Sequence, residues 1–339
     1  MTDQVLSGVS QPDDDPALRP RNFEEFIGQQ RVKENLLIYV EAARKRGETL
    51  DHVLFSGPPG LGKTTLSILI ADALGASLRT TSGPAIERPG DLVGILTSLE
   101  EGDVLFIDEI HRLGRAIEEY LYAAMENFVV DITLEQGAYA KSVRIPLPRF
   151  TLAGATTREG LLTSPFRARF GIVEKLELYP PEDLETIVRN SAARLRVPID
   201  RKGAQVLARC SRGTPRVANR LLRRVRDISQ VAGSGEVDER AAWAGLERLG
   251  VDRHGLCPMD RRIIETLLRA GGGPVGLKTI AVTVGEEDDT IEDVYEPYLI
   301  QSGYIDKTPR GRVPTRLSFE RYGVPGDANG RGQKSLFES

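Results

Sequence analysis

Cysteine is scarce in this sequence of 339 residues, which contains only Cys210 and Cys257. Two thiols so distant in sequence form neither a disulfide framework nor a metal-binding pair, so we expect a reducing compartment, the cytoplasm. No apolar run approaches the length of a membrane-spanning helix, and the N-terminal segment lacks the basic and apolar regions of a signal peptide, so we expect no membrane association. The formal net charge is only −4. Any basic surface that binds nucleic acid must therefore be local.

The first half of the chain alternates between strand-like and helix-like patterns. Short apolar runs occupy residues 53–56, 104–107 and 151–155, and helical segments such as 63–74 lie between them. This alternation predicts an α/β domain whose parallel sheet has helices on both faces. Residues 129–147 instead alternate apolar and polar positions around a turn, which predicts a hairpin inserted into that domain.

The second half predicts two smaller domains. Tyr179-Pro180-Pro181 marks a boundary, and the four segments that follow are all helical in pattern (182–195, 200–211, 215–230 and 238–248). Beyond Val251, three helical segments (259–270, 276–284 and 289–302) precede a short hairpin at 304–317, which is the winged-helix pattern. We therefore expect a disordered tail (1–17), an α/β domain (18–179), an all-helical lid domain (180–250), a winged-helix domain (251–323) and a C-terminal tail (324–339).

A phosphate-binding loop follows the first predicted strand. Residues 57–64, GPPGLGKT, match the pattern G-x-x-x-x-G-K-[ST]. Gly57, Gly60 and Gly62 let backbone N–H groups approach phosphate oxygens, and the following helix N-terminus favours an anion. Lys63 can reach the β- and γ-phosphates, while the Thr64 hydroxyl can bind Mg²⁺. The alternative is a glycine- and proline-rich turn before a helix, but the strand before the loop and the helix after it favour an ATP site.

A second predicted strand ends in two carboxylates, Asp108 and Glu109. The carboxyl edge of a parallel sheet is where α/β folds bind ligands, so both side chains are expected near the phosphates. Asp108 would contribute to the Mg²⁺ shell, and Glu109 would polarise the attacking water. An apolar strand that enters a solvated turn would give the same pattern, so this segment is informative mainly beside the phosphate-binding loop.

Longer motifs resemble the RuvB family of AAA+ ATPases, which are ring motors that migrate Holliday junctions. They include DEIHRL at 108–113, GATTR at 154–158, FRARFG at 166–171, GTPR at 213–216 and TPRGR at 308–312. The resemblance extends from about residue 18 to about residue 323. It implies an ATP hydrolase that drives branch migration in recombination and repair, with ATP and Mg²⁺ as cofactors.

The resemblance also implies roles for individual residues. Thr157, with Thr156 as the alternative, resembles sensor 1, and Arg216 resembles sensor 2 in the lid. Arg169, with Arg167 as the alternative, resembles an arginine finger that is supplied to a neighbouring subunit. Residues expected to contact the nucleotide are Leu18, Arg19, Gly57, Gly60, Gly62, Lys63, Thr64, Thr65, Glu126, Asn127, Phe128, Arg169, Tyr179 and Arg216.

The predicted wing carries the local basic cluster, Lys307, Arg310 and Arg312. The helix before it is strongly acidic and would repel phosphate, so the wing is expected to contact the DNA backbone without reading sequence. A solvated hairpin is the alternative interpretation. Two other functions remain open at this point, namely a clamp-loader or initiator-like switch and a winged-helix regulator with a nucleotide-sensing domain.

The resemblance implies several macromolecular partners. They are duplex DNA and four-way junctions, a RuvA-type junction-binding protein, a RuvC-type resolvase and further copies of this chain in a hexameric ring. The RuvA-type protein is expected to dock on hairpin 129–147, whose tip is Gly137-Ala138-Tyr139-Ala140. Three places depart from the family pattern, namely Leu134-Glu135-Gln136, Asn127 and Lys307. None of them concerns the phosphate chemistry, and the change in the hairpin concerns partner docking.

Overall fold

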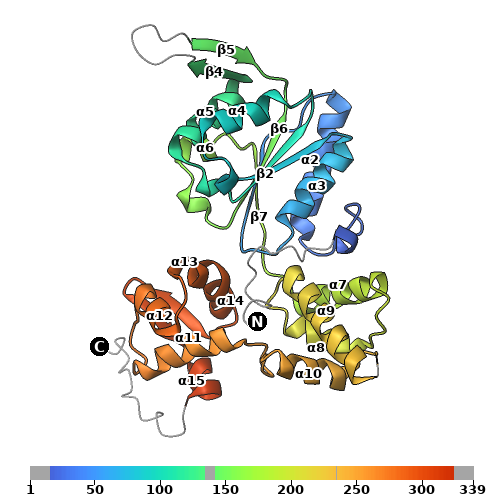
Figure 1. Ribbon diagram of the computed structural model, residues 1–339, viewed down its shortest axis with the longest axis vertical. Coiled ribbons are helices and arrows are strands. Elements are labelled where there is room, and N and C mark those ends of the chain that lie inside the picture. The colour runs from blue at the N-terminus through green and yellow to red at the C-terminus, as the bar shows by residue number, and fades with distance from the viewer. Residues whose placement is uncertain (1–15, 134–141, 234, 324–339) are drawn as a thin grey trace, which may run out of the picture. The chain divides into compact units, whose positions relative to one another are not determined.

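The computed structural model describes residues 16–133, 142–233 and 235–323. The chain forms two compact units, which divide between Tyr179 and Pro180 (Figure 1). Most of the predicted N-terminal tail, the hairpin tip at 134–141 and the predicted C-terminal tail lie outside the described residues.

The first unit is built on a parallel sheet with the strand order β2-β3-β6-β1-β7. Its strands are β1 (Val53–Ser56), β2 (Leu78–Ser82), β3 (Val104–Asp108), β6 (Thr151–Thr156) and β7 (Ile172–Lys175). The three strands predicted from apolar runs, β1, β3 and β6, are confirmed and are adjacent in the centre of the sheet. β2 and β7, which we did not predict, form its two edges.

Alternate residues of the central strands pack into two cores, one on each face of the sheet. Leu105 and Ile107 of β3 face a core shared with helices α4 (Pro89–Thr97), α5 (Arg115–Asn127) and α6 (Ser164–Arg167). Val104 and Phe106 face the opposite core, beside α3 (Lys63–Leu74). Helix α2 (Gln30–Arg46) packs on α3 (Figure 1). Both faces of the sheet are therefore covered, as a parallel sheet requires.

Short segments complete the first unit. The predicted hairpin forms as antiparallel strands β4 (Val129–Thr133) and β5 (Ser142–Pro146). Arg144 donates to both carboxylate oxygens of Asp131 across this hairpin, from Nε at 2.9 Å and from Nη2 at 3.1 Å. The described residues of this unit also form four 3₁₀ turns, namely η1 (Pro16–Leu18), η2 (Gly83–Ala85), η3 (Ile110–Arg112) and η4 (Glu159–Leu161).

The lid domain is helical, as predicted. It contains α7 (Pro181–Arg194), α8 (Arg201–Arg209), α9 (Pro215–Ala232) and α10 (Glu239–Arg248). Three of these helices begin at a side-chain cap, because Asp200, Thr214 and Asp238 each accept a hydrogen bond from a backbone N–H in the first turn. The apolar face of α9 is buried against α7 and α10.

The winged-helix domain begins with α11 (Pro258–Arg269) and α12 (Leu277–Val284). Its wing is the antiparallel pair β8 (Ile305–Thr308) and β9 (Gly311–Pro314), and α15 (Arg316–Tyr322) closes the fold. The regular helix that we predicted at 289–302 is wrong in detail. It consists of α13 (Asp288–Thr290), a π-helical segment η5 (Ile291–Tyr295) and α14 (Glu296–Gln301). Pro297 explains the change, because it lacks the N–H that an α-helix would donate to residue 293.

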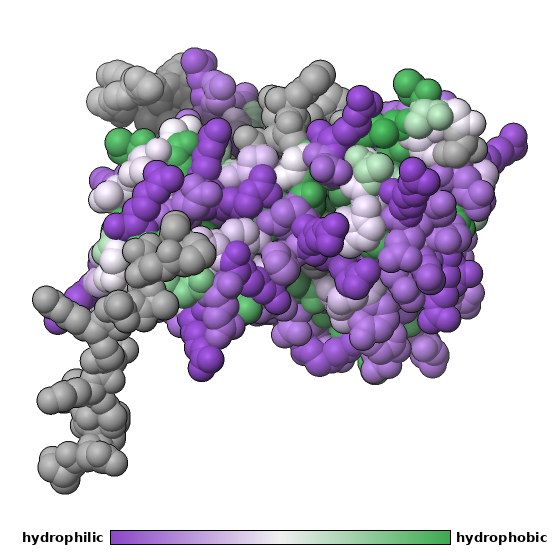
Figure 2. All heavy atoms as spheres, turned by 90° about the horizontal axis from the view of Figure 1, so that it is seen from below, coloured by the Kyte–Doolittle hydropathy of each residue, from purple (hydrophilic) through white to green (hydrophobic). Residues whose placement is uncertain are grey.

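The surface is dominated by polar side chains. Figure 2 shows one face on which hydrophilic residues cover most of the area and hydrophobic residues occur in small patches. Across the described ranges, no helix is both long and apolar enough to span a membrane.

Candidate ATP site and DNA-facing surface

The phosphate-binding loop connects β1 to the N-terminus of α3. Gly57 and Gly62 have φ values of 133° and 101°, which are unfavourable for residues with a side chain. A Cβ at Gly57 would lie 2.5 Å from the carbonyl oxygen of Leu176, and one at Gly62 would lie 3.1 Å from the Phe26 ring. Both positions therefore require glycine for conformation and for space. The Nζ of Lys63 donates to the carbonyl oxygens of Gly57 at 2.7 Å and Pro58 at 2.8 Å, so its ammonium group lies within the loop.

The two predicted carboxylates lie at the carboxyl end of β3. Asp108 is the last residue of that strand, and its Oδ1 accepts a hydrogen bond of 2.9 Å from the backbone N–H of Glu109. Glu109 itself has a φ of 49°, a conformation that non-glycine residues adopt mainly at functional or strained positions. Its carboxylate pairs with Arg112 at 3.0 Å, and both side chains are about half exposed, so the pair is weak and easily exchanged for another partner.

The magnesium ligands proposed from sequence fit a site that is completed by the nucleotide. Thr64 lies in the first turn of α3, and Asp108 ends the second strand away from β1 in the sheet. Within the described part of the chain, no group of three or more histidine, cysteine, aspartate or glutamate residues could hold a metal. A hydroxyl and one carboxylate suit Mg²⁺, which takes its remaining ligands from phosphate and water in such sites.

The two candidates for sensor 1 differ in environment. Thr156 pairs with Ser56 at the ends of β6 and β1, and it is buried. Its hydroxyl lies 3.0 Å from His111 Nδ1 and accepts a hydrogen bond of 2.9 Å from the N–H of Arg158. Thr156 therefore connects β6 to the turn that follows Glu109. Thr157 lies just beyond the strand and is partly exposed.

Tyr179 packs against the loop from the end of the first unit. It is buried, and its hydroxyl donates a hydrogen bond of 3.1 Å to the carbonyl oxygen of Leu61. Leu18 is also buried, at the end of the η1 turn. The structure therefore places Tyr179 beside the phosphate-binding loop.

The predicted arginine finger is held by helix α5. The Nη2 atom of Arg169 lies 2.9 Å from Glu126 Oε1 and donates to the hydroxyl of Tyr122. The guanidinium carbon is 4.6 Å from the centroid of the Tyr122 ring. Helix α5 packs against α4, α6 and β4, whereas α3 packs on the other core of the sheet. Arg169 is thus supported by elements separate from those that hold its own phosphate-binding loop.

Three further nucleotide contacts implied by the resemblance lie at the end of α5. Glu126 faces Arg169, and Asn127 is exposed. Phe128 has a φ of 52° and packs edge-on against Phe150, with ring centroids 5.8 Å apart. Phe128 therefore closes the edge of the core as well as ending the helix.

Arg216 lies in the second compact unit. It is the second residue of α9, directly after Pro215, and Thr214 caps the helix by accepting from the N–H of Val217. The first turn of a capped helix holds the Arg216 backbone in one place. Its side chain is the lid's candidate contact to phosphate.

The three basic residues of the wing have different environments. Arg310 lies in the turn between β8 and β9 and is exposed. Lys307 is half exposed and its Nζ lies 2.9 Å from Glu292 and 3.2 Å from Glu296. The hydrogen bond to Glu292 is the largest of the effects that raise the pKa of Lys307. Arg312 is buried and donates to Glu296 from Nε at 3.0 Å and from Nη2 at 2.6 Å.

These contacts correct one part of the sequence analysis. We expected the basic cluster of the wing to contact the DNA backbone, but the acidic helix turns Glu292 and Glu296 toward Lys307 and Arg312. Arg312 is largely neutralised inside the domain, so its geometry argues against a direct role in phosphate binding. Arg310 has the exposure that a backbone contact needs.

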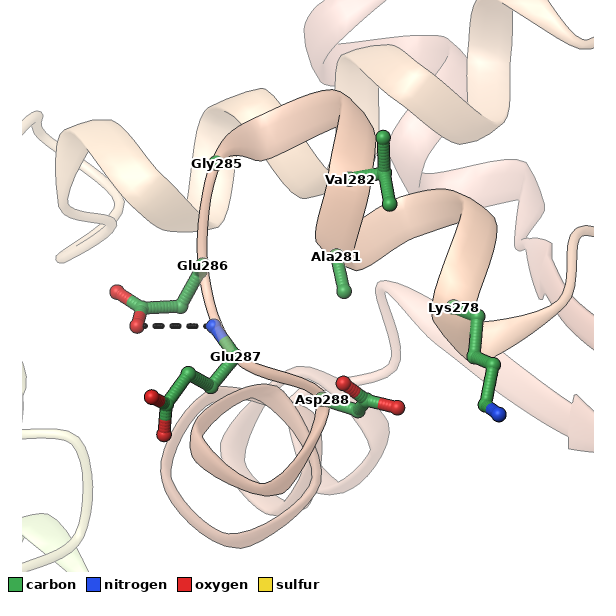
Figure 3. Close-up of a pocket in the computed structure, with 7 residues that line it drawn as sticks. All are labelled: Lys278, Ala281, Val282, Gly285, Glu286, Glu287 and Asp288. Atoms are coloured by element: carbon green, nitrogen blue, oxygen red, sulfur yellow. Dashed lines mark hydrogen bonds between the residues drawn. The ribbon is translucent and has the colours of Figure 1, made fainter.

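The start of the acidic helix forms a shallow pocket against α12, about 520 Å³ in volume. Figure 3 shows that the Asp288 side chain points toward Lys278, whereas the Glu286 side chain points away from α12. Three of the residues that line it are acidic, including Glu287, and only Lys278 is basic. This surface would repel a DNA backbone, in agreement with the expectation that the wing and not this helix contacts DNA.

Sequence reasoning missed several residues around these sites. Phe26 packs on Gly62, Tyr122 stacks on Arg169, and His111 is bonded to Thr156. Each contact joins residues that are distant in sequence. His111 alone carried a signal, because it lies two residues after Glu109 within the DEIHRL motif.

Comparison with known proteins covers all three domains. Residues 18–176 match the family model for the Holliday junction DNA helicase RuvB P-loop domain, residues 179–252 that for the RuvB AAA lid domain, and residues 253–322 that for the RuvB C-terminal winged helix domain. These matches confirm the predicted fold class of a P-loop domain, a helical lid and a winged helix.

Individual relatives match over most of the chain. A protein of Rubrobacter xylanophilus, the Holliday junction branch migration complex subunit RuvB, is 58% identical over 314 residues, which cover 92% of this chain and 88% of that protein. The protein of the same name from Myxococcus xanthus is 57% identical over 307 residues and 90% of each chain. The solved structure of the Thermotoga maritima RuvB Holliday junction branch migration motor has a TM-score of 0.84 at 47% identity, and the match covers 91% of this chain and 100% of that one. The chain therefore belongs to the RuvB family.

Proposed function

We propose that this protein is an ATP-driven motor that migrates four-way DNA junctions as a ring. We also propose that it acts in the cytoplasm, where its two cysteines stay reduced. The observation that carries the proposal is the convergence of three segments at one edge of the sheet. The phosphate-binding loop follows β1, Thr157 follows β6, and Asp108 and Glu109 lie at the end of β3, and these three strands are neighbours.

Each residue of the candidate ATP site has a separate proposed role in hydrolysis. The glycine amides and Lys63 bind the phosphates, and Glu109 orients the water that attacks the γ-phosphate. Thr64 and Asp108 would hold Mg²⁺, which neutralises phosphate charge when bound. Thr157 is the better candidate for the contact to the γ-phosphate, because the Thr156 hydroxyl is already bonded to His111 and Arg158.

Arg169 would complete the site of a neighbouring subunit. Its support on α5, away from the core that holds α3, favours a role in trans. Glu126 and Tyr122 keep the guanidinium group in place, and the charge that develops on the phosphoryl oxygens would then be stabilised across the interface. A head-to-tail contact of this kind closes into a ring, and we propose six subunits, as the resemblance implies.

The domains would convert hydrolysis into movement of DNA. We propose an ATPase domain at 18–179, a lid at 180–250 that brings Arg216 to the phosphates, and a winged-helix domain at 251–323. Arg310 at the tip of the wing is the proposed contact to the DNA backbone, with Lys307 beside it. A contact to backbone alone suits a motor that moves along any sequence.

The proposed function includes two protein partners, a junction-binding protein and a resolvase. The relatives named above are subunits of a branch migration complex, which supports a RuvA-type junction-binding protein as the partner of the β4–β5 hairpin. Val143 on β5 is exposed and offers an apolar contact there. A RuvC-type resolvase would act on the same junction.

A direct experiment measures ATP-dependent migration of a synthetic four-way junction by the purified chain and a RuvA-type protein. We expect migration by the wild type and by Lys45→Ala, which removes an exposed surface charge on α2. Lys63→Ala should abolish both hydrolysis and migration. Hydrolysis without migration would favour a clamp-loader-like switch, and sequence-selective DNA binding with negligible turnover would favour a regulator.

A further inference from the structure

Arg212 belongs to the lid, but its side chain contacts the winged-helix domain. It follows α8, has a φ of 53° and is buried, with a side-chain exposure of 3%. Its Nη1 donates to Asp260 Oδ2 at 3.1 Å, and its Nη2 lies 3.1 Å from Asp260 Oδ1. One charge-assisted hydrogen bond, to Oδ2, and one close charge contact, to Oδ1, thus join the guanidinium group to the carboxylate.

The acceptor, Asp260, is part of the framework of the winged-helix domain. Its side chain is fully buried in the first turn of α11, where its Oδ2 also accepts a hydrogen bond of 2.9 Å from the N–H of Cys257. The same carboxylate therefore caps α11 and neutralises Arg212. An ion pair enclosed in this way is held in place, because separating it would leave a buried charge unpaired.

The rest of the guanidinium group is enclosed by the irregular third helix. Nη2 donates to the carbonyl oxygen of Val294 at 3.2 Å, within the π-helical segment. The guanidinium carbon lies 5.2 Å from the ring centroid of Tyr295 and 4.9 Å from that of Tyr298. Arg212 thus contacts both α11 and the helix that precedes the wing, which are the two main supports of the DNA-facing end.

The chain segment between the two domains is also fixed. A Cβ at Gly255 would lie 3.1 Å from the Cα of Cys210, so the backbones of the linker and the lid are in close contact. Asp252 accepts a hydrogen bond of 2.6 Å from the hydroxyl of Tyr322 in α15. Arg261 donates to the carbonyl oxygens of Gly250 and Leu256. These contacts fix the linker to both domains, so it is unsuited to act as a hinge between them.

Arg212 also lies close in sequence to the proposed nucleotide sensor. Only Gly213, Thr214 and Pro215 separate it from Arg216, and Thr214 caps the helix on which Arg216 lies. One short loop therefore holds the residue proposed to contact phosphate and the residue that contacts the DNA-binding domain.

We propose that Arg212 is the positioning residue that makes the lid and the winged-helix domain move as one rigid body. The winged-helix domain then rotates through the same angle as the lid during the nucleotide cycle. The hinge of the motor lies before residue 180. The transmission role rests on the proposed function, whereas the rigid connection stands on the contacts of Arg212 alone.

A distance measurement tests the rigid connection without hydrolysis or DNA. Spin labels at Asn190→Cys on α7 and Val282→Cys on α12 would occupy exposed positions in the two domains, with the labelled chain diluted into unlabelled chain. The native cysteines should stay unlabelled, because burial raises the pKa of Cys210 to about 12 and also raises that of Cys257. We expect one narrow distance distribution that is the same without nucleotide, with ADP and with a non-hydrolysable ATP analogue. A broad or nucleotide-dependent distribution in this otherwise native chain would overturn the proposal.

A variant then tests whether Arg212 is responsible. Arg212→Met with Asp260→Leu removes both charges while retaining apolar volume, and Arg209→Met is the matched control because Arg209 is an exposed arginine at the end of the preceding helix, α8. We expect a broadened distance distribution, ATP hydrolysis within about twofold of wild type, and about tenfold less junction migration per ATP. An unchanged distribution with unchanged migration per ATP would reject the role of Arg212. Loss of hydrolysis in Lys63→Ala is a separate measurement that concerns the proposed function alone.

Discussion

Arg312 and Glu296 form a buried ion pair beneath the wing, in which both Nε and Nη2 of the arginine donate to Glu296 Oε2. The two residues are far enough apart in sequence to lie on different elements, β9 and α14. This pair assigns one basic residue of the wing to the stability of the domain, and it leaves the exposed Arg310 as the proposed contact to DNA.

Arg310→Ala should weaken binding to duplex DNA of any sequence. Loss of one phosphate contact should reduce the slope of log K against log salt by about one, because fewer counterions are released. Fluorescence anisotropy over a range of salt concentrations measures this slope. Arg316→Ala removes another exposed arginine, on α15, and serves as the control. An Arg310→Ala slope equal to that of wild type would remove the tip of the wing from the DNA interface.

Arg312→Ala should destabilise the winged-helix domain by about 3–5 kcal/mol, because it leaves the Glu296 carboxylate buried without its partner. Hydrogen exchange of the β8 and β9 amides should become much faster. The double replacement Arg312→Met with Glu296→Leu should recover most of the protection, since no unpaired charge remains, and its DNA salt slope should match wild type. Normal exchange in Arg312→Ala would mean that the pair contributes little to stability.

Much of the α/β domain could be predicted because its signals are local. β1, β3 and β6 are short apolar runs, and the glycine-rich loop between β1 and α3 has a fixed pattern. The edge strand β2 has the sequence LRTTS and only partial burial, so it carries no apolar run to detect. β7 is four residues long and alternates buried and exposed positions, too short a pattern to separate from a loop.

The pairing of charges could not be predicted. A basic cluster on a hairpin has the same sequence pattern whether its arginines face solvent or a buried carboxylate. Arg312 pairs with Glu296 because helix α14 packs under the wing, and Arg212 pairs with Asp260 because α11 begins beside the end of α8. These relations depend on packing between distant segments, which composition and spacing do not specify.

Acidification should destabilise the first unit through His52. This ring is buried, its Nδ1 accepts from the N–H of Leu152 at 2.9 Å, and its Nε2 lies 3.2 Å from the carbonyl oxygen of Met125. Burial is the main cause that lowers the pKa of His52. The neutral ring is therefore favoured in the folded state, and the unfolded state binds more protons as pH falls below about 6.5.

Nuclear magnetic resonance of the ring protons should give a titration midpoint for His52 below about 6.5. The free energy of unfolding should fall with decreasing pH in that range, by at most about 1.4 kcal/mol per pH unit from this group. His52→Gln retains one acceptor and one donor and should lose this part of the slope. An ordinary or raised midpoint for His52 would contradict the assignment of a neutral, buried imidazole.

Val143→Glu should weaken docking of the RuvA-type partner on the β4–β5 hairpin. A carboxylate at this exposed apolar position would have to be desolvated on binding. Hydrolysis in the absence of the partner should be unchanged, while its stimulation by the partner should be lost. Val173→Glu, at a similarly exposed valine on β7, should behave as wild type. Full stimulation of Val143→Glu would place the contact elsewhere.

The most direct test of the motor combines two defective chains. Arg169→Ala should lower hydrolysis by about 10³-fold while ATP still binds, and Glu109→Gln should bind ATP without cutting it. In an equal mixture, about a quarter of the interfaces join an intact Glu109 to an intact Arg169 from the neighbour, if subunits assemble at random. We predict that ATP hydrolysis in the mixture rises to about a quarter of the wild-type rate and that junction migration returns with it. Mixtures that remain as inactive as the separate variants at every ratio would contradict the account.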